Sequence, residues 1–177
     1  MSIRFMERQG TLRPQDVIIA IGLLRWGKEI PQKDLASKLL LSPAEIVKSL
    51  KRLEKSHLID SNKKVDKTAL LNFIKHGLRI AFPAQIGPMK KGIKTSLSHL
   101  GLQKHLKQKP EYAYVWESDK GKHLGQSVTP LYPGLELLAK NDRDFYEILS
   151  SLEVIRLEDN KISNKAVKYL SGTLRGI

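Results

Sequence analysis

Residues 30–59, IPQKDLASKLLLSPAEIVKSLKRLEKSHLI, carry the signals of two short helices that follow one another across a tight turn. In the second half, Pro43 suits the first position of a helix, because its fixed backbone torsion is already helical there. Ser42 precedes it as a capping residue, and Glu45 stands three residues after Ser42, where the pair completes a capping box. The pattern predicts a helix over residues 42–56.

This expected helix has an apolar side and a basic side. At 100° per residue, Leu50 and Leu53 lie within about 40° of Ile46, so these side chains share a face that can be buried. The polar side, flanked by Arg52, carries Ala44, Lys48, Lys51 and Lys55. An ordinary amphipathic helix with a solvated face has the same pattern, so the face alone does not assign a partner.

Two further helices are expected before this one. Residues 14–26 begin with Pro14, are apolar on one face and are followed by Gly27, which can end a helix. Residues 32–39 follow Pro31, which favours an extended residue before it and therefore separates the two segments. The chain thus predicts three short helices in close succession.

The net charge is large and unevenly distributed. It is +13 over 177 residues. Residues 1–110 contain 22 Lys and Arg against 8 Asp and Glu, whereas residues 111–177 contain 9 against 10. A basic part joined to a near-neutral part is typical of proteins that bind a polyanion, although a solvated lysine-rich surface has the same composition.

Composition and segment lengths exclude several classes of protein. The chain has no cysteine, so it forms neither a disulfide framework nor a thiolate zinc site. The first residues lack the apolar run of a secretion signal, and the apolar run at residues 17–24 is too short to cross a bilayer. We expect a cytoplasmic protein with no membrane association, no metal site and no cofactor.

Across residues 14–66 the sequence resembles the helix-turn-helix of winged-helix transcription regulators, especially the MarR-like and IclR-like groups. The resemblance rests on Leu35 and Ala36 in the second helix, LS before the third, the apolar positions along the third, and SHLI after it. In such families the third helix enters the major groove of DNA and the second helix braces it.

The resemblance also implies which residues contact DNA. The leading edge of the third helix would face bases, and the cations of that helix would lie against the DNA. The start of the second helix would contact backbone phosphate, and a wing would reach the minor groove. The implied residues are Gln32, Lys33, Ser42, Ala44, Val47, Lys48, Lys51, Arg52, Lys63 and Lys64.

The sequence departs from the family's pattern at three places. Leu40 stands where the family usually has glycine, so the turn is expected to be either strained or reshaped. His57 replaces another usual glycine, and histidine is more often found with positive φ than most residues. Few residues remain for a hairpin between Ile59 and residue 67, so the wing is expected to be short or absent.

The middle of the sequence predicts a helix over residues 68–77, a strand over residues 78–87 and then a mobile basic loop. The loop contains GPMKKGIKT, which is close to a phosphate-binding P-loop, but Ile93 displaces Lys94 from the register that reaches the phosphates. Two histidines of the loop, His99 and His105, have no third ligand at a suitable spacing, which argues against a metal site.

The last third predicts a β-hairpin followed by helices. Tyr112, Tyr114 and Trp116 alternate with smaller residues before a turn at residues 119–122, and we expect these aromatic side chains to pack in a core instead of stacking on bases. Asp142 and Ser163 are expected to cap the two following helices.

The predicted fold class is mainly α with small β elements (α+β). A winged helix-turn-helix domain is expected at residues 1–84, a basic mobile loop or linker at residues 85–110, and a hairpin with C-terminal helices at residues 111–177. The last part is expected to serve dimerisation or regulation.

The predicted function is that of a sequence-specific DNA-binding transcription regulator, not an enzyme, which binds double-stranded DNA as a homodimer through residues 42–56. The alternative is an RNA-binding or scaffold adaptor that uses the same basic face. A nucleic-acid-processing enzyme is the third hypothesis, because a fold does not determine a function. The sequence names neither an operator nor a small-molecule effector.

Overall fold

The computed structural model describes residues 11–176, which form two compact units. We call them the N-terminal unit (residues 11–70) and the C-terminal unit (Leu71–Gly176). The chain is of the α+β class, mostly helical with a small β-sheet. The division falls inside helix α4 (Lys67–His76), and not near residues 85–110 as predicted. Among the described residues, no helix combines the length and apolar character needed to cross a bilayer.

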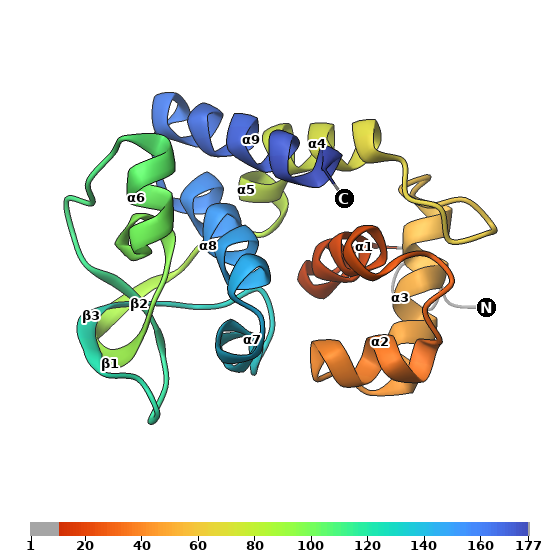
Figure 1. The fold of residues 1–177 in the computed structure, drawn as a ribbon, viewed down its shortest axis with the longest axis horizontal. Helices are drawn as coiled ribbons and strands as arrows, with labels where there is room; N and C mark the ends of the chain where they lie inside the picture. Colours follow the sequence, from red (N-terminus) through yellow and green to blue (C-terminus); the bar gives the residue numbers. More distant parts are fainter. Residues whose placement is uncertain (1–10, 177) are drawn as a thin grey trace, which may run out of the picture. The chain divides into compact units, whose positions relative to one another are not determined.

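The N-terminal unit contains α1 (Pro14–Trp26), α2 (Gln32–Leu39), α3 (Pro43–Lys55) and the first turn of α4 (Figure 1). The bounds of α1 and α2 are those that the sequence predicts. Pro14 lies in the first turn of α1, and Gly27 ends that helix with a φ of 86°. The largest fully buried side chains of the unit are Ile18, Ile19, Ile21, Leu35, Leu39, Ile46, Leu53 and Leu70.

The turn between α2 and α3 is left-handed at Leu40. Its φ and ψ are 55° and 37°, and its N–H donates to the carbonyl of Ser37 at 3.3 Å. The N–H of Leu41 donates to the carbonyl of Ala36 at 3.0 Å, so the last carbonyls of α2 are satisfied as in a glycine-capped helix. The sequence predicted that Leu40 would either strain this turn or change its shape. The turn keeps the left-handed shape, so the strain falls on the backbone of Leu40.

The connection from α3 to α4 is a tight loop. His57 has a φ of 55°, which agrees with the expectation that a histidine at this position can adopt a positive φ. Ile59 and Val65 form an isolated antiparallel bridge. Between them, the Asp60 carboxylate accepts the N–H groups of Asn62 at 2.8 Å and Lys64 at 2.9 Å. The connection is as short as predicted.

The C-terminal unit contains the rest of α4 and a series of short elements around two long helices. These are α5 (Leu78–Ala81), β1 (Ile86–Lys94), the 3-10 helix η2 (Ser96–Ser98), α6 (Leu100–Leu106), β2 (Tyr114–Glu117), β3 (His123–Val128), α7 (Leu135–Asn141), α8 (Arg143–Leu157) and α9 (Asn160–Arg175). The predicted strand over residues 78–87 is wrong for most of its length, since residues 78–81 are helical, residues 82–85 are not in a strand, and β1 begins only at Ile86.

The predicted mobile loop at residues 85–110 is also wrong, because most of that segment forms β1, η2 and α6. Leu97, Leu102 and Leu106 are buried, so the segment has its own share of the core. The lysine-rich composition suggested disorder, but the leucines between the lysines supply enough apolar surface to order the chain.

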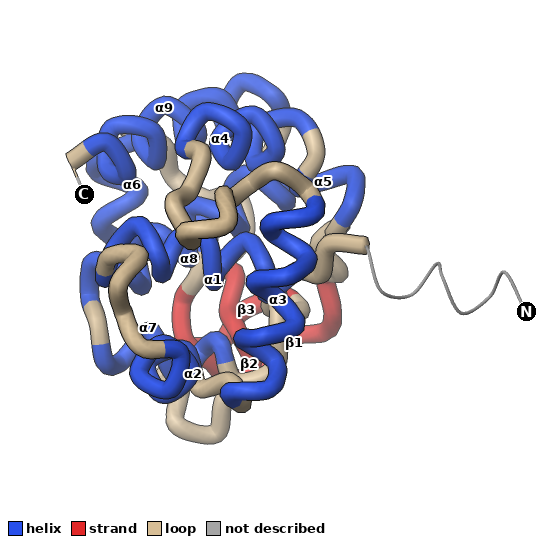
Figure 2. The backbone as a smooth tube through the Cα atoms, turned by 90° about the vertical axis from the view of Figure 1, so that its right-hand side faces the viewer, coloured by secondary structure: helices blue, strands red, loops and turns tan. Residues whose placement is uncertain are grey.

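The sheet joins β1 to both later strands, and the predicted β2–β3 hairpin does not form. Figure 2 shows the strands in red. Gly92 of β1 pairs antiparallel with Glu117 of β2 and with His123 of β3. β2 and β3 lie parallel to each other, with Tyr114 opposite Gln126. A Cβ on Gly92 would lie 2.1 Å from the Trp116 carbonyl oxygen, so only glycine fits where the strands meet.

Helix α8 supplies much of the core of the C-terminal unit, including Phe145, Ile148, Leu149 and Leu152. Asp142 caps it as predicted, accepting the N–H of Phe145 at 2.9 Å. The predicted cap of the last helix is wrong: Asp159, not Ser163, caps α9 and accepts the N–H of its third residue, Ile162, at 2.9 Å. Of the three aromatic residues predicted to pack in a core, Trp116 is fully buried and Tyr114 is partly buried, but the prediction is wrong for Tyr112, which is 52% exposed.

A buried ion pair lies on the same helix. Arg156 donates to the Glu153 carboxylate at 2.6 Å, and the Trp116 indole N–H donates to it at 3.2 Å. The Arg156 guanidinium also donates to three backbone carbonyls, those of Phe82, Pro83 and Thr129. These three carbonyls hold the Arg156 guanidinium in addition to the Glu153 carboxylate.

Candidate nucleic-acid interface

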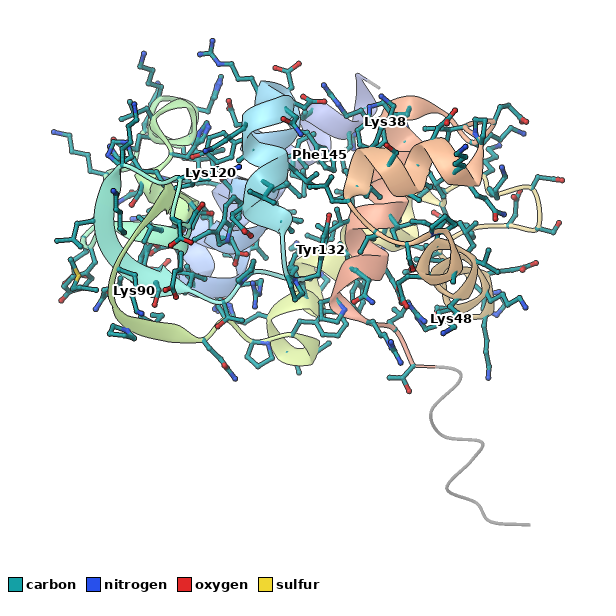
Figure 3. The ribbon with its side chains drawn as sticks, turned by 90° about the horizontal axis from the view of Figure 1, so that it is seen from below. Lys38, Lys48, Lys90, Lys120, Tyr132 and Phe145 are labelled. Atoms are coloured by element: carbon teal, nitrogen blue, oxygen red, sulfur yellow. The ribbon has the colours of Figure 1, made fainter. Side chains whose placement is uncertain are left out.

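Helix α3 exposes a row of cations on the side opposite its buried face. Lys48, Lys51 and Lys55 are exposed, and within residues 11–176 none of them forms an ion pair (Figure 3 labels Lys48). Ile46, Leu50 and Leu53 are buried, as the helical periodicity predicts. The lysine charges are therefore available to a partner in solution.

The amino end of α3 is small and accessible. Ser42 caps the helix, with its hydroxyl oxygen accepting the N–H of Glu45 at 3.1 Å. Ala44 is exposed and Val47 is 37% exposed, so both present small apolar surfaces beside the first lysine of the row. Side chains of this size allow a helix end to lie close to a base edge or a thymine methyl.

The predicted capping box is only half formed. The Glu45 carboxylate accepts the side chains of Gln15 at 2.9 Å and Arg52 at 2.9 Å, and so is engaged away from the cap. Partial burial raises the pKa of Glu45, but the hydrogen bonds from Arg52 and Gln15 outweigh it and hold that pKa below its ordinary value. The carboxylate is thus a structural partner of Arg52.

Arg52 itself is not a candidate DNA contact, which corrects the sequence interpretation. Its side chain is 6% exposed, and its guanidinium donates to both carboxylate oxygens of Asp16, at 2.8 Å and 2.7 Å. Asp16 is fully buried and also accepts the Ser49 hydroxyl and the N–H of Arg13. The helical wheel places Arg52 at the edge of the polar face, and a buried acid on α1 draws it inward.

The remaining predicted residues lie on two other segments of the N-terminal unit. Gln32 and Lys33 open α2 and are exposed. In the loop after α3, Lys64 is exposed and Lys63 is half-buried with a φ of 60°. Apart from Arg52, the predicted side chains are therefore at least partly accessible.

Sequence reasoning missed Asp16 as the residue that fixes α3 against α1. The signal was present, because Asp16 is the acidic residue in the otherwise apolar stretch DVIIAIGLL, where a charge needs a partner. The sequence does not reveal which of the many cations is that partner.

Other chemistries have less support within residues 11–176. No group of three His, Asp or Glu side chains lies close enough to hold a metal ion. The stretch that approaches a P-loop sequence is the extended strand β1, whereas a P-loop wraps between a strand and a helix.

Comparisons with protein-family models, with curated proteins and with solved structures find no match to this chain.

Proposed function

We propose that the N-terminal unit is a winged helix-turn-helix module that binds double-stranded DNA, and that the protein is a transcription regulator. The observation that carries the proposal is the row of unpaired, exposed lysines on α3, on a helix whose other face is buried. The resemblance of residues 14–66 to winged-helix regulators supports the same assignment of α3 to the major groove.

In this proposal the parts of α3 have different roles. Lys48 and Lys51 contact phosphates, which supplies affinity but little sequence preference. Ser42, Ala44 and Val47 at the amino end meet base edges, which supplies specificity. The Asp16–Arg52 pair supports both roles indirectly, because it holds α3 at a defined position on α1.

Two further groups extend the contact. Gln32 and Lys33 at the start of α2 meet the DNA backbone, and Lys63 and Lys64 take the place of a wing near the minor groove.

We also propose that the protein binds as a homodimer, because two copies read two half-sites of one operator. Sedimentation of the protein at micromolar concentration, with and without DNA, tests this; a monomer in both conditions contradicts it.

Binding assays on the full chain test the function. Fluorescence anisotropy with duplex DNA, duplex RNA and single strands, repeated over a salt series, is expected to rank duplex DNA first. Selection from a randomised duplex library is expected to enrich one motif. Preference for duplex RNA would favour the adaptor hypothesis, and cleavage of any probe would favour a nucleic-acid-processing enzyme.

A further inference from the structure

The C-terminal unit contains a cavity of about 450 Å³ that the proposed DNA contact does not use. It lies at the end of β1 and is bounded by the start of α6, the loop between β2 and β3, the end of α7 and the first turn of α8. Its volume lies within the range of small-molecule sites, about 300–1,000 Å³.

Basic side chains from four parts of the unit line this cavity. They are Lys94 at the end of β1, Lys120 and Lys122 in the β2–β3 loop, Lys140 on α7 and Arg143 at the start of α8 (Figure 3 labels Lys120). Within residues 11–176 none of these side chains forms an ion pair. Lys140 donates to the backbone carbonyl of Lys120 at 3.4 Å, which leaves its charge uncompensated.

Among the lining residues, Glu147 is the acidic one, and its charge is already engaged. Its carboxylate accepts the hydroxyl of Tyr169 at 2.6 Å, and the same oxygen lies 3.2 Å from Nε2 of His105. Five cations therefore face one carboxylate, which is hydrogen-bonded to Tyr169. A concave surface lined by one sign of charge concentrates the opposite charge from solution.

The lining is held in place by side chains of the core. The Tyr146 hydroxyl donates to the backbone carbonyl of Lys94, which joins the end of β1 to α8. The His99 ring packs edge-on against Tyr146 at 4.4 Å, and its Nδ1 accepts the N–H of Leu102 at 3.3 Å. These contacts fix the end of β1 and the start of α6, so this part of the lining needs no rearrangement when a ligand enters, which lowers the entropic cost of binding.

We propose that this cavity binds a small phosphorylated molecule. Phosphate is a compact, multiply charged anion, which suits lysines and an arginine that converge on one hollow from separate elements. A nucleic-acid strand would instead require cations spaced along a groove.

Calorimetric titration of the full chain with pyrophosphate and with ATP, in about 0.15 M salt, tests the proposal. Saturable binding of at least one of these probes is expected. Lys120→Gln with Arg143→Gln removes two exposed charges of the cavity and is expected to weaken binding about tenfold or more. Lys75→Gln with Lys161→Gln removes two exposed charges elsewhere in the unit and is expected to change it less than about twofold.

Three outcomes would overturn the proposal. One is the absence of saturable binding of both probes to the wild type. Another is an equal loss in the cavity and control variants, because the attraction would then be diffuse. The last is a cavity variant, folded by circular dichroism, that loses binding of a short single-stranded oligonucleotide as strongly as that of pyrophosphate. Single Lys122→Gln protein repeats the test if the double variant does not fold.

Discussion

Asp16 and Arg52 are 36 residues apart in the chain, yet the Arg52 guanidinium donates to both oxygens of the buried Asp16 carboxylate. The pair joins the first turn of α1 to the last part of α3. Because both groups are removed from water, each requires the other for its charge to be tolerated. The position of the proposed recognition helix therefore depends on this pair.

Replacing Arg52 with Met is expected to lower the free energy of unfolding by about 3 kcal/mol or more, because Asp16 would remain buried without its cation. Chemical denaturation measures the loss. Lys51→Met, next to it and exposed, is the control and should change stability by less than about 0.5 kcal/mol. Asp16→Leu combined with Arg52→Met should recover most of the loss. Unchanged stability in Arg52→Met would contradict a structural role for this arginine.

Lys48→Ala and Lys51→Ala are expected to weaken binding to all duplex DNA sequences similarly. Each should also reduce the slope of log affinity against log salt by about one, since each removes one phosphate contact. Anisotropy titrations at several salt concentrations measure the slope. Lys75→Ala and Lys161→Ala, also made singly, each remove the same charge from another exposed position. An equal effect of these controls would mean that binding is not localised on α3.

Ala44→Glu is expected to impair the selected DNA motif more than random duplex DNA. The reason is that a larger acidic side chain at the leading end of α3 meets base edges only in the specific complex. Competition between the two DNAs gives the specificity ratio for each protein. An unchanged ratio with reduced overall affinity would show that position 44 faces the phosphate backbone instead.

Leu40→Gly is expected to raise the free energy of unfolding by about 0.5–1 kcal/mol. The Leu40 backbone is left-handed, which is unfavourable for a residue with a Cβ, and the side chain is 47% exposed, so little burial is lost. Leu40→Ala, which shortens the side chain but keeps the Cβ, should bring no such gain. If the two variants are equally stable, the turn does not strain Leu40.

Glu153 is expected to make stability depend on pH. Burial raises its pKa to about 7 against the ordinary 4.5, although Arg156 and Trp116 act in the opposite direction. The folded state therefore keeps a proton that the unfolded chain releases. This contribution to stability is fully present below pH 4.5 and is lost as pH rises through about 7.

Glu153→Gln imitates the protonated side chain, so the free energy of unfolding of this variant should not fall as pH rises through about 7. In the wild type that fall amounts to about 3 kcal/mol at most. Denaturation followed by Trp116 fluorescence in a Trp26→Phe background, at about pH 5 and about pH 8, compares the two proteins. Parallel pH dependence in both would show that Glu153 is ionised throughout.

The sequence by itself determined the elements whose signals are local. Helices α1, α2 and α3 have the predicted positions because Pro14, Gly27 and the cap at Ser42 lie within a few residues of the ends they define. The same holds for Asp142 at the start of α8. The buried and exposed sides of α3 follow from helical periodicity, which placed Lys48 on the exposed side.

Tertiary structure alone decided the features that depend on partners distant in the chain. Arg52 is buried because Asp16 lies beside it, a contact that periodicity within α3 cannot reveal. Residues 86–94 are a strand because β2 and β3 supply hydrogen-bond partners, whereas their own lysines and glycines suggested a loop. The cationic cavity likewise exists only where folding brings Lys94, Lys120 and Arg143 together, since no sequence spacing relates them.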